Sequence, residues 1–447
     1  MESHRARQYP FVPDATLFEV ARAEGAYLMT PDGRRILDAA GGAVVVNVGH
    51  GRREVAEAYA RATADTSYLV PPFVTEARVQ LVERLRERWL PPGLTRIGFT
   101  SGGSEAMDAA IRLARHHHVA AGRPRRWKVI GRQLSYHGTT LATLAIGDHT
   151  KRRAGLEPWF PELPKAPAPY CLRCPLGARY PDCAVACADE LDRIIAREDP
   201  DTVAAFVAEP IGGSTAGALV PPDEYWPRVA EICRRHGVLL IADEVMTGFG
   251  RTGRRFAVEH WGVVPDILIS GKGLTGGYAP IAGIYTTEAV VAPLAARGEE
   301  FMFYTYAAHP GCCAAAVAVL DILEREDLVA RAAEMGRRLR QRLTTLEAHP
   351  HVAEIRGRGL LLAVELVKDR ATLAPFPPGA GLTRKVVVAG LLDGTFFYPG
   401  GTDPARDVIV LGPPFIITED EIDQMVAALE RAITTAVGWV AASSAAT

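Results

Sequence analysis

The chain has 447 residues, 48% of them hydrophobic and 23% charged, and its 50 basic and 52 acidic residues give a formal net charge of −2. These values predict a packed globular protein of two or three domains and argue against a nucleic-acid binder or a polybasic membrane anchor, both of which need a basic face. The sequence has no apolar run of about 18 residues that would predict a transmembrane helix, and the start MESHRARQYPFVPD lacks the apolar core of a secretory signal, so we expect a cytoplasmic protein.

The N-terminal part of the chain contains a predicted β-hairpin. The segment YLMTPDGRRILDAAGG places Asp32 and Gly33 between two apolar runs. Asp-Gly is a preferred pair for the tight turn of a hairpin. We expect this hairpin to belong to a smaller domain that the C-terminal part of the chain completes.

From about residue 95 onward, strand-like and helix-like segments alternate. Helices are predicted over Glu105–Ala121, Cys187–Arg197 and Pro222–His236. Continuous apolar runs are typical of parallel strands that helices cover on both faces, so the fold class is α/β. Each apolar run ends in Gly, Ser, Asp or Glu, as in TRIGFTSGG, WKVIGRQLSYHG, VAAFVAEPIGG, VLLIADEV and DILISGKG.

A Pro- and Cys-rich segment interrupts this alternation. Residues 161–183 contain six prolines and predict a long surface loop. Cysteines in and just after it have the spacing C-x2-C-x8-C-x3-C, formed by Cys171, Cys174, Cys183 and Cys187. The four thiols could hold a structural zinc or be reduced surface thiols, and both alternatives stay open. The odd total of seven cysteines disfavours a disulfide framework.

The last part of the chain has a different character. Helices are predicted over Val329–Ala348, Thr383–Ala389 and Glu419–Val437, with a hairpin in VAEIRGRGLLLAVELV and a strand in DVIVLG. Residues 438–447 are expected to be a frayed tail. We therefore predict a large domain over residues 65–325, with a mainly parallel central sheet, and a small α+β domain from residues 1–64 and 326–447.

Five predicted strand ends carry the chemistry. Gly102, Gly103 and Ser104 lie between a strand and a helix, where exposed N–H groups can bind a phosphate. Tyr136 and His137 end the next strand, and a tyrosine there can stack on a flat ring. Because the carboxyl ends of parallel strands meet at one crevice, these groups are expected to face the same ligand.

Two further strand ends bring in charged groups, and a third brings in an amine. Glu209 ends one strand, and Asp243 follows another that is wholly apolar, where a carboxylate needs a cationic or hydrogen-bonding partner. Lys272 follows a third such strand, and a desolvated lysine becomes a nucleophile towards carbonyls. A phosphate cup, a stacking aromatic, a carboxylate for a pyridinium and a reactive lysine are the groups that pyridoxal 5'-phosphate needs.

The order of motifs resembles the class III (omega) aminotransferases of PLP fold type I. The resemblance rests on SGGSEA, SYHG, AEPIGG, ADEVMTGFGRTG, SGKGLTGGYAPIAG and YTYAAHP, and it extends to DAAGGAVVVNVGHG and VLGPPFIITEDEID. The resemblance covers nearly the whole chain. Within the family, the sequence is most similar to the branch that includes the amine:pyruvate transaminases.

This resemblance implies roles for residues around the cofactor. Tyr136 would stack on the pyridine ring with His137 beside it, and Val245 would pack on the opposite face. Asp243 would pair with the pyridinium nitrogen, and Glu209 would lie near the ring and act through hydrogen bonds.

The resemblance also implies the catalytic residue and the assembly. Lys272 would form the Schiff base with the cofactor and move the proton, with Asp243 as its catalytic partner. Gly103 and Ser104 would hold the cofactor phosphate, and Thr305 would reach it from the neighbouring subunit of a homodimer. The sequence does not distinguish a dimer from a tetramer.

Around the expected substrate pocket the sequence departs from the family. Ala43, Val44 and Val45 stand where family members often have a Trp or another bulky residue. The pocket would then be roomier or be filled from elsewhere, with Tyr68, Phe73 and Tyr136 as its aromatic walls.

A second departure concerns the substrate carboxylate. The stretch FFYPGGTDPARD stands where family members commonly carry an arginine, and it contains Tyr398 and Arg406. We predict that Arg406, or less favourably an arginine from elsewhere, binds the carboxylate. Phe303 and Tyr304 also replace the usual residues before Thr305, which adds bulk at the dimer side of the pocket.

The resemblance implies an aminotransferase that moves an amino group from an amine or ω-amino acid to a keto acid such as pyruvate by a ping-pong mechanism. Racemases, aminomutases, lyases and a decarboxylase bind the same cofactor on this fold. The alternative to an aminotransferase is therefore a non-transaminating enzyme of the same fold. A binding or regulatory protein that kept the fold is disfavoured by the intact Lys272 and Asp243.

Overall fold

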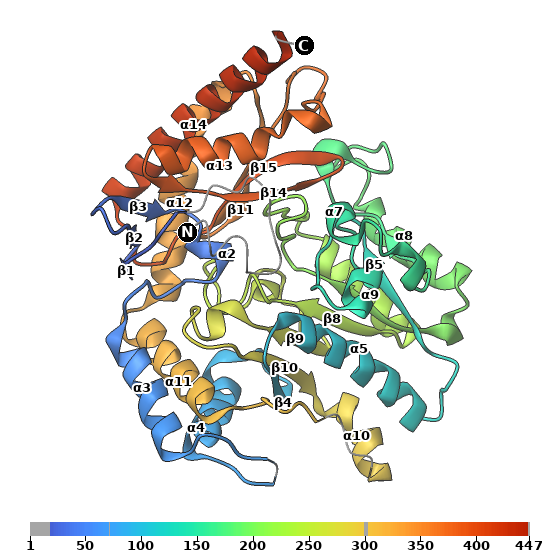
Figure 1. Ribbon diagram of the computed structural model, residues 1–447. Helices are drawn as coiled ribbons and strands as arrows, with labels where there is room; N and C mark the ends of the chain where they lie inside the picture. The colour runs from blue at the N-terminus through green and yellow to red at the C-terminus, as the bar shows by residue number, and fades with distance from the viewer. Residues whose placement is uncertain (1–17, 71, 299–302, 446–447) are drawn as a thin grey trace.

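A seven-stranded sheet forms the centre of the computed structural model, which describes residues 18–70, 72–298 and 303–445 (Figure 1). In spatial order its strands are β4 (Leu94–Thr100), β10 (Ala282–Thr287), β9 (Ile267–Ser270), β8 (Leu239–Asp243), β7 (Val203–Ala208), β5 (Lys128–Arg132) and β6 (Lys165–Ala166). Strand β10 runs antiparallel to β4 and β9, and the other pairs are parallel. The predicted mainly parallel sheet is therefore confirmed.

Helices cover both faces of this sheet. Successive strand residues point to opposite faces. Val207 and Ile241 pack towards α5 (Gly103–Ala120) and α10 (Glu288–Arg297), whereas Phe206 and Leu240 pack towards α8 (Ala186–Arg197) and α9 (Tyr225–His236). This double burial explains why the strands are continuous apolar runs. The three predicted helices in this region are present with starts shifted by one to three residues.

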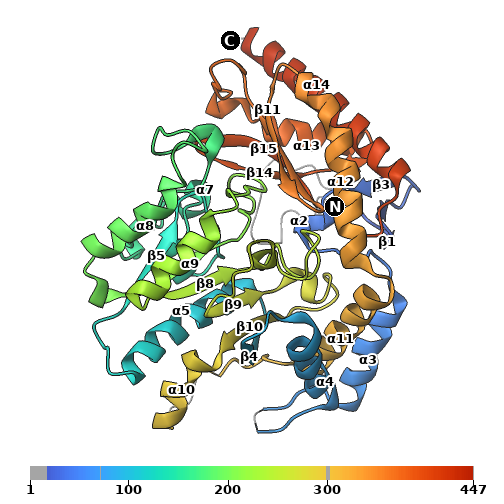
Figure 2. The same cartoon turned by 180° about the vertical axis from the view of Figure 1, so that it is seen from behind.

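Segments from the two chain ends lie side by side (Figures 1 and 2). One four-stranded sheet has the order β1 (Arg22–Glu24), β2 (Tyr27–Met29), β3 (Arg35–Asp38) and β13 (Thr395–Phe396). The antiparallel β2–β3 pair is the predicted hairpin, and β13 joins β3 in parallel. A second four-stranded sheet has the order β11 (Val352–Arg358), β12 (Leu361–Leu366), β15 (Ala405–Leu411) and β14 (Tyr398–Thr402). The division into domains 65–325 and 1–64 with 326–447 stays a prediction.

The remaining helices pack around these sheets. The N-terminal half contributes α2 (Gly41–Val44), α3 (Arg53–Asp65), α4 (Glu76–Arg84), α6 (Leu141–Ile146) and α7 (Thr150–Arg153). The C-terminal part contributes α11 (Pro310–Arg325), α12 (Leu328–Leu343), α13 (Leu382–Leu392) and α14 (Glu419–Ala445). A 3₁₀ turn over Thr344–Ala348 ends the segment that the sequence predicted as one helix to Ala348.

Helix α14 is longer than predicted. It continues to Ala445, so the expected frayed tail from residue 438 is wrong up to that point. The extension is held because Val440 packs into the core and the tail is rich in small residues that tolerate a helix. By length and composition alone, its Glu419–Ser443 part could cross a membrane, with a mean hydropathy of 1.3, but 44% of that window is buried inside the protein. A core helix of a soluble protein passes the same test.

The Pro- and Cys-rich segment is more ordered than the predicted surface loop. It contains β6, which pairs with β5 at the edge of the central sheet. Its Tyr170 is buried and donates a hydrogen bond to the Glu365 carboxylate on β12, which Arg173 also contacts at 3.0 Å. These contacts explain why the segment is fixed against the C-terminal part of the chain.

The four clustered cysteines are all unpaired in this structure. Burial, helped by the other three thiols, raises the pKa of Cys187 to about 12. Within residues 18–70, 72–298 and 303–445, no three His, Cys, Asp or Glu side chains are grouped so as to hold a metal ion. Zinc binding by these thiols stays an untested alternative.

Arg251 joins the loop after β8 to segments from both ends of the chain. Its buried guanidinium donates hydrogen bonds to the carbonyl oxygens of Val46 at 2.9 Å, Leu360 at 3.1 Å and Pro413 at 2.6 Å. Its carbon Cζ also lies 4.6 Å from the centre of the Phe415 ring. One side chain thus satisfies three backbone acceptors that would otherwise be buried without a donor.

Replacing Arg251 with Met should destabilise the protein strongly. The variant keeps much of the side-chain volume but leaves three buried carbonyls without a donor. At roughly 1–3 kcal/mol for each unsatisfied group, the loss should be at least about 3 kcal/mol, seen as a lower urea midpoint. The exposed Arg254→Met is the matched control and should change stability by less than about 0.5 kcal/mol. Equal stability of both variants would contradict this role.

Candidate active site

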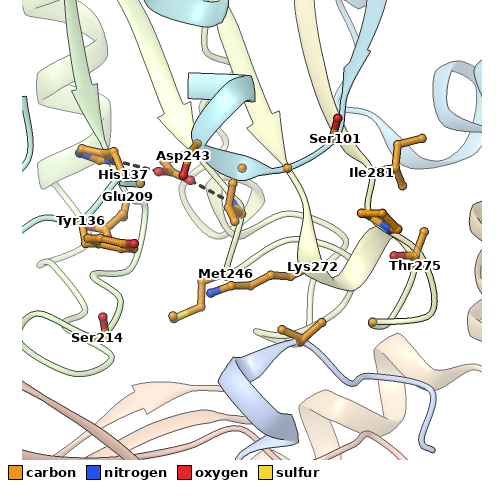
Figure 3. Close-up of a pocket in the computed structure, with 18 of the residues that line it drawn as sticks. Ser101, Tyr136, His137, Glu209, Ser214, Asp243, Met246, Lys272, Thr275 and Ile281 are labelled. Atoms are coloured by element: carbon orange, nitrogen blue, oxygen red, sulfur yellow. Dashed lines mark hydrogen bonds and ion pairs between the residues drawn. The ribbon is translucent and has the colours of Figure 1, made fainter. Parts of the chain in front are cut away.

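A cavity opens at the carboxyl edge of the central sheet, where the five predicted strand ends meet (Figure 3). Its walls include Gly103 and Ser104 after β4, Tyr136 and His137 after β5, Glu209 after β7, Asp243 and Val245 after β8, and Lys272 after β9. Residues far apart in the sequence therefore converge because parallel strands end at the same edge. The structure brings together all the cofactor residues predicted from this protomer.

The start of α5 forms one end of this cavity. The first-turn N–H groups of a helix have no acceptor within the helix, and the positive end of its dipole attracts anions. Ser104 Oγ accepts a hydrogen bond from the Thr139 N–H at 3.1 Å, which leaves its own proton free to donate. Gly138 permits this approach, since a Cβ there would lie 2.5 Å from Ser104 Oγ. This end of the cavity is suited to a phosphate.

Asp243 is a buried anion in the cavity wall. Its Oδ2 is 2.8 Å from His137 Nδ1, and its Oδ1 accepts a hydrogen bond from the Val245 N–H at 3.0 Å. The carboxylate is 4% exposed, so these two donors compensate for only part of its lost hydration. A protonated ring nitrogen of a ligand would supply the missing cation.

Glu209 is the second buried carboxylate of the site. Its Oε1 accepts a hydrogen bond from the Gly213 N–H at 2.9 Å, whereas Oε2 has no hydrogen-bond partner and lies 3.8 Å from Arg132 Nη2. Burial raises the pKa of Glu209, and the charges of His137 and Arg132 oppose that rise. The unsatisfied oxygen is available to a ligand group.

Tyr136 forms an aromatic wall. His149 packs edge-on against it, with ring centres 5.9 Å apart, and Arg152 Cζ lies 4.9 Å from the centre of the Tyr136 ring. Burial raises the pKa of the Tyr136 phenol, so it stays neutral. The ring can therefore present a flat apolar face to the cavity.

Lys272 extends into the cavity towards Met246, with Asp243 and Glu209 on the facing wall (Figure 3). Burial lowers the pKa of the Lys272 amine to about 8, although the carboxylates of Asp243 and Glu209 oppose this shift. Lys272 also has φ +36°, a left-handed conformation that is unfavourable for a side-chain-bearing residue. Strain and desolvation at one lysine mark a functional position.

These residues fit pyridoxal phosphate. The helix start and Ser104 match the phosphate, and Asp243 matches a pyridinium nitrogen. Two buried polar atoms beside the cavity, His137 Nε2 and Glu209 Oε2, have no hydrogen-bond partner among the residues that the structure describes. Lys272 supplies the amine that can capture an aldehyde.

Val245 lines the cavity, and its position also explains why residue 103 is a glycine. A Cβ on Gly103 would lie 2.9 Å from Val245 Cγ1, so only glycine allows this close packing. Any larger residue at position 103 would push Val245 into the space for the cofactor ring.

The predicted substrate residues are more scattered than the cofactor residues. Val44 is buried in the core, and the cavity wall is formed instead by its neighbour Val45. The reason is the turn at α2, where Gly42 (φ 65°) and Val44 (φ 59°) have left-handed conformations and Val44 packs next to Gly412. The position predicted from the motif is thus displaced by one residue.

Tyr68 and Phe73 do not line the cavity of this protomer. They lie between α3 and α4 and are 39% and 61% exposed. The Tyr68 ring is 6.4 Å from that of Tyr306, in the segment that contains the exposed Thr305. Their roles as aromatic walls, and that of Thr305 at a phosphate, therefore depend on a second subunit and stay predictions.

Tyr398 and Arg406 line a neighbouring cavity, which shares Ser214 with the first. Arg406 is already engaged there. It contacts Asp403 Oδ1 at 2.5 Å through Nη2 and donates to the Phe376 carbonyl at 3.0 Å. Its role as the carboxylate-binding residue stays untested.

Sequence reasoning missed several residues of the cavity wall: Ser101, Ser214, Met246, Thr275 and Ile281. Ser101, Met246 and Thr275 lie within three residues of predicted site residues. Proximity in the motif was the available signal, but no residue type among them indicates a particular chemistry.

Glu244 is the other acidic residue after β8, and it has a structural role. Its carboxylate accepts hydrogen bonds from the N–H groups of Ala257 at 2.9 Å and Val258 at 2.8 Å, and from the Thr247 hydroxyl. Burial raises its pKa to about 7. Glu244 therefore fixes the loop that follows Asp243 rather than facing the cavity.

Comparison with known proteins agrees with this geometry. The family model described as aminotransferase class-III matches residues 11–433. An uncharacterised aminotransferase of Schizosaccharomyces pombe is 38% identical and aligns over 94% of this chain and 93% of its own. A putrescine–pyruvate aminotransferase of Pseudomonas aeruginosa is 35% identical, over 91% of this chain and 88% of its own. The crystal structure of an (S)-enantioselective omega-transaminase from Thermomicrobium roseum has a TM-score of 0.91 at 36% identity and covers 98% of both chains.

The lowered pKa of Lys272 predicts how pyridoxal phosphate rebinds to protein from which it has been removed. The neutral amine is the nucleophile, so the rate of covalent capture should rise with pH, with its midpoint near pH 8, and then level off. Stopped-flow absorbance across neutral and alkaline pH measures this rate. Lys272→Ala is the control and should show no covalent capture. A midpoint near the ordinary lysine value of about 10.4 would contradict the assignment.

Proposed function

Because the chain belongs to the class III aminotransferases, which use pyridoxal phosphate, we propose that it moves an amino group from an amine or ω-amino acid to a keto acid such as pyruvate. The observation that carries this proposal is the desolvated Lys272 facing Asp243 and Glu209 in one cavity. The putrescine–pyruvate aminotransferase among the relatives supports the choice of amine and acceptor.

The bound cofactor supplies an electron-accepting ring that stabilises negative charge on the substrate carbon. The residues of this chain do the rest. Asp243, oriented by His137 and the Val245 N–H, holds the ring nitrogen in its protonated form. The start of α5 and Ser104 hold the phosphate. Tyr136 and Val245 fix the ring between them.

Lys272 moves the proton. With a pKa near 8, its amine is partly neutral at physiological pH and can both take up and return a proton. The amino group would pass by way of the bound cofactor from the donor, which leaves as a ketone or aldehyde with its oxygen taken from water, to the keto acid, and Lys272 would move the proton in both half-reactions. The kinetics are then ping-pong.

A homodimer completes the site. Phe303, Thr305 and Tyr306 are exposed on one segment. Phe73, just before α4, is also exposed. In this proposal Thr305 reaches the phosphate of the partner subunit, and the aromatic residues line the partner's pocket. The enzyme is expected to be cytoplasmic.

Mixing the purified enzyme with alanine tests the proposed activity. The cofactor absorption should change and pyruvate should appear in an amount equal to that of the sites, and pyruvate added in excess should restore the original spectrum. Lys272→Ala is the control and should give neither change. No half-reaction with any amine or amino acid would contradict the proposal and favour a non-transaminating enzyme of the same fold.

Mixed dimers test the role of Thr305. A dimer of one Lys272→Ala and one Thr305→Ala subunit should contain one intact site, because both defects fall on the other site. Activity at limiting cofactor should therefore exceed that of either parent dimer after the two are dissociated and reassociated together. Mixed dimers no more active than the average of their parents would place Thr305 at its own subunit's site or at neither.

A further inference from the structure

Arg152 lies beside the cavity and was not among the predicted site residues. It belongs to the short helix α7, and its Cζ is 4.9 Å from the centre of the Tyr136 ring. Burial lowers the pKa of Lys272, and the two carboxylates oppose that shift. The positive charge of Arg152 makes a smaller contribution in the lowering direction. The guanidinium is therefore close enough to the reacting region for its charge to be felt there.

The two cavities are neighbours that share a wall residue. Ser214 lines both, and Arg152 lines the second together with His149, Tyr398 and Arg406. A substrate whose amine faces Lys272 could therefore extend past Tyr136 and Ser214 towards α7. A substrate's far end would meet Arg152 on that route.

Arg152 differs from Arg406 and Arg153 in having no hydrogen-bond partner for its guanidinium among the described residues. Arg406 is paired with Asp403, and Arg153 donates to the Gly147 carbonyl at 2.6 Å. Arg152, by contrast, makes no side-chain hydrogen bond or ion pair with any residue in the part of the chain that the structure describes. A guanidinium with free donors suits a carboxylate, which it can bind through two parallel hydrogen bonds.

The surroundings favour an anion. Lys151 adds a second positive charge and donates to the Gly401 carbonyl at 3.2 Å. Burial, reinforced by Arg152 and Lys151, lowers the pKa of His149 to about 4, so this histidine is neutral at physiological pH. Asp407, the other acid of this cavity, is bound by the Thr383 hydroxyl at 2.9 Å.

We propose that Arg152 binds the distal carboxylate of ω-amino-acid substrates, the end that lies away from the reacting amine, in place of Arg406. This inference rests on the proposed function, because it assigns one end of the substrate to a residue of the same site. The Tyr136 ring beneath the guanidinium holds it in place without using its hydrogen-bond donors.

The test compares substrates with and without a carboxylate. In Arg152→Gln, the concentration of 4-aminobutyrate needed for half-maximal single-turnover rate should rise roughly tenfold to 100-fold, the effect of losing a charge-assisted hydrogen-bonded pair. The maximal rate should change little. Benzylamine, which has no carboxylate, should react as in the parent. Arg406→Gln tests the competing assignment and should leave the 4-aminobutyrate value unchanged.

Binding of propionate gives a readout that does not depend on turnover. Propionate has a carboxylate but neither amine nor carbonyl, and calorimetric titration should show weaker binding to Arg152→Gln than to the parent or Arg406→Gln. Equal losses with benzylamine and 4-aminobutyrate, or a carboxylate-specific loss in Arg406→Gln alone, would overturn the inference. If the parent reacts with no amine at all, the proposed function fails, and the propionate titration alone decides the role of Arg152.

Discussion

The burial of the Asp243 carboxylate at the end of β8 is the constraint on which the site depends. An ionised group in that place is stable only with donors and a cation around it. His137, 106 residues earlier in the chain, contributes one contact at 2.8 Å, and the Val245 N–H contributes another. What remains unbalanced is the charge itself, and a pyridinium balances it. In the proposed function, Tyr136, Val245 and Lys272 would each face the ring that Asp243 holds.

The chain ends matter to this arrangement as much as the central sheet does. Val45 reaches the cavity from the N-terminal segment, and Tyr398 approaches from β14. Arg251 links these parts by binding the carbonyls of Val46, Leu360 and Pro413 beside the loop that carries Asp243. The geometry of the substrate side thus depends on a hydrogen-bonded junction formed by one buried side chain, outside the reacting centre.

Much of the fold and most of the cofactor site could be predicted from the sequence, for a definable reason. Buried parallel strands are apolar throughout, so the polar residue at each strand end stands out, and the sheet itself brings Glu209, Asp243 and Lys272 together. The substrate side offers no such rule. Which of Val44 and Val45 faces the cavity depends on left-handed residues in α2, and Arg152 approaches Tyr136 from the four-residue helix α7, which is too short to have a periodic signal. The length of α14 depended on the packing of Val440, which is visible only in the folded chain.

The central claim is that Lys272 carries the cofactor. The chain has six lysines, and Lys272 alone among them lines the cavity with Asp243 in the described structure. Reduction of the purified enzyme with borohydride, followed by peptide mass spectrometry, identifies the lysine to which the cofactor is bound. The account predicts a phosphopyridoxyl group on the peptide ILISGKGLTGGY at Lys272 and on no other lysine. Modification of a different lysine, or none in enzyme saturated with pyridoxal phosphate, would contradict it.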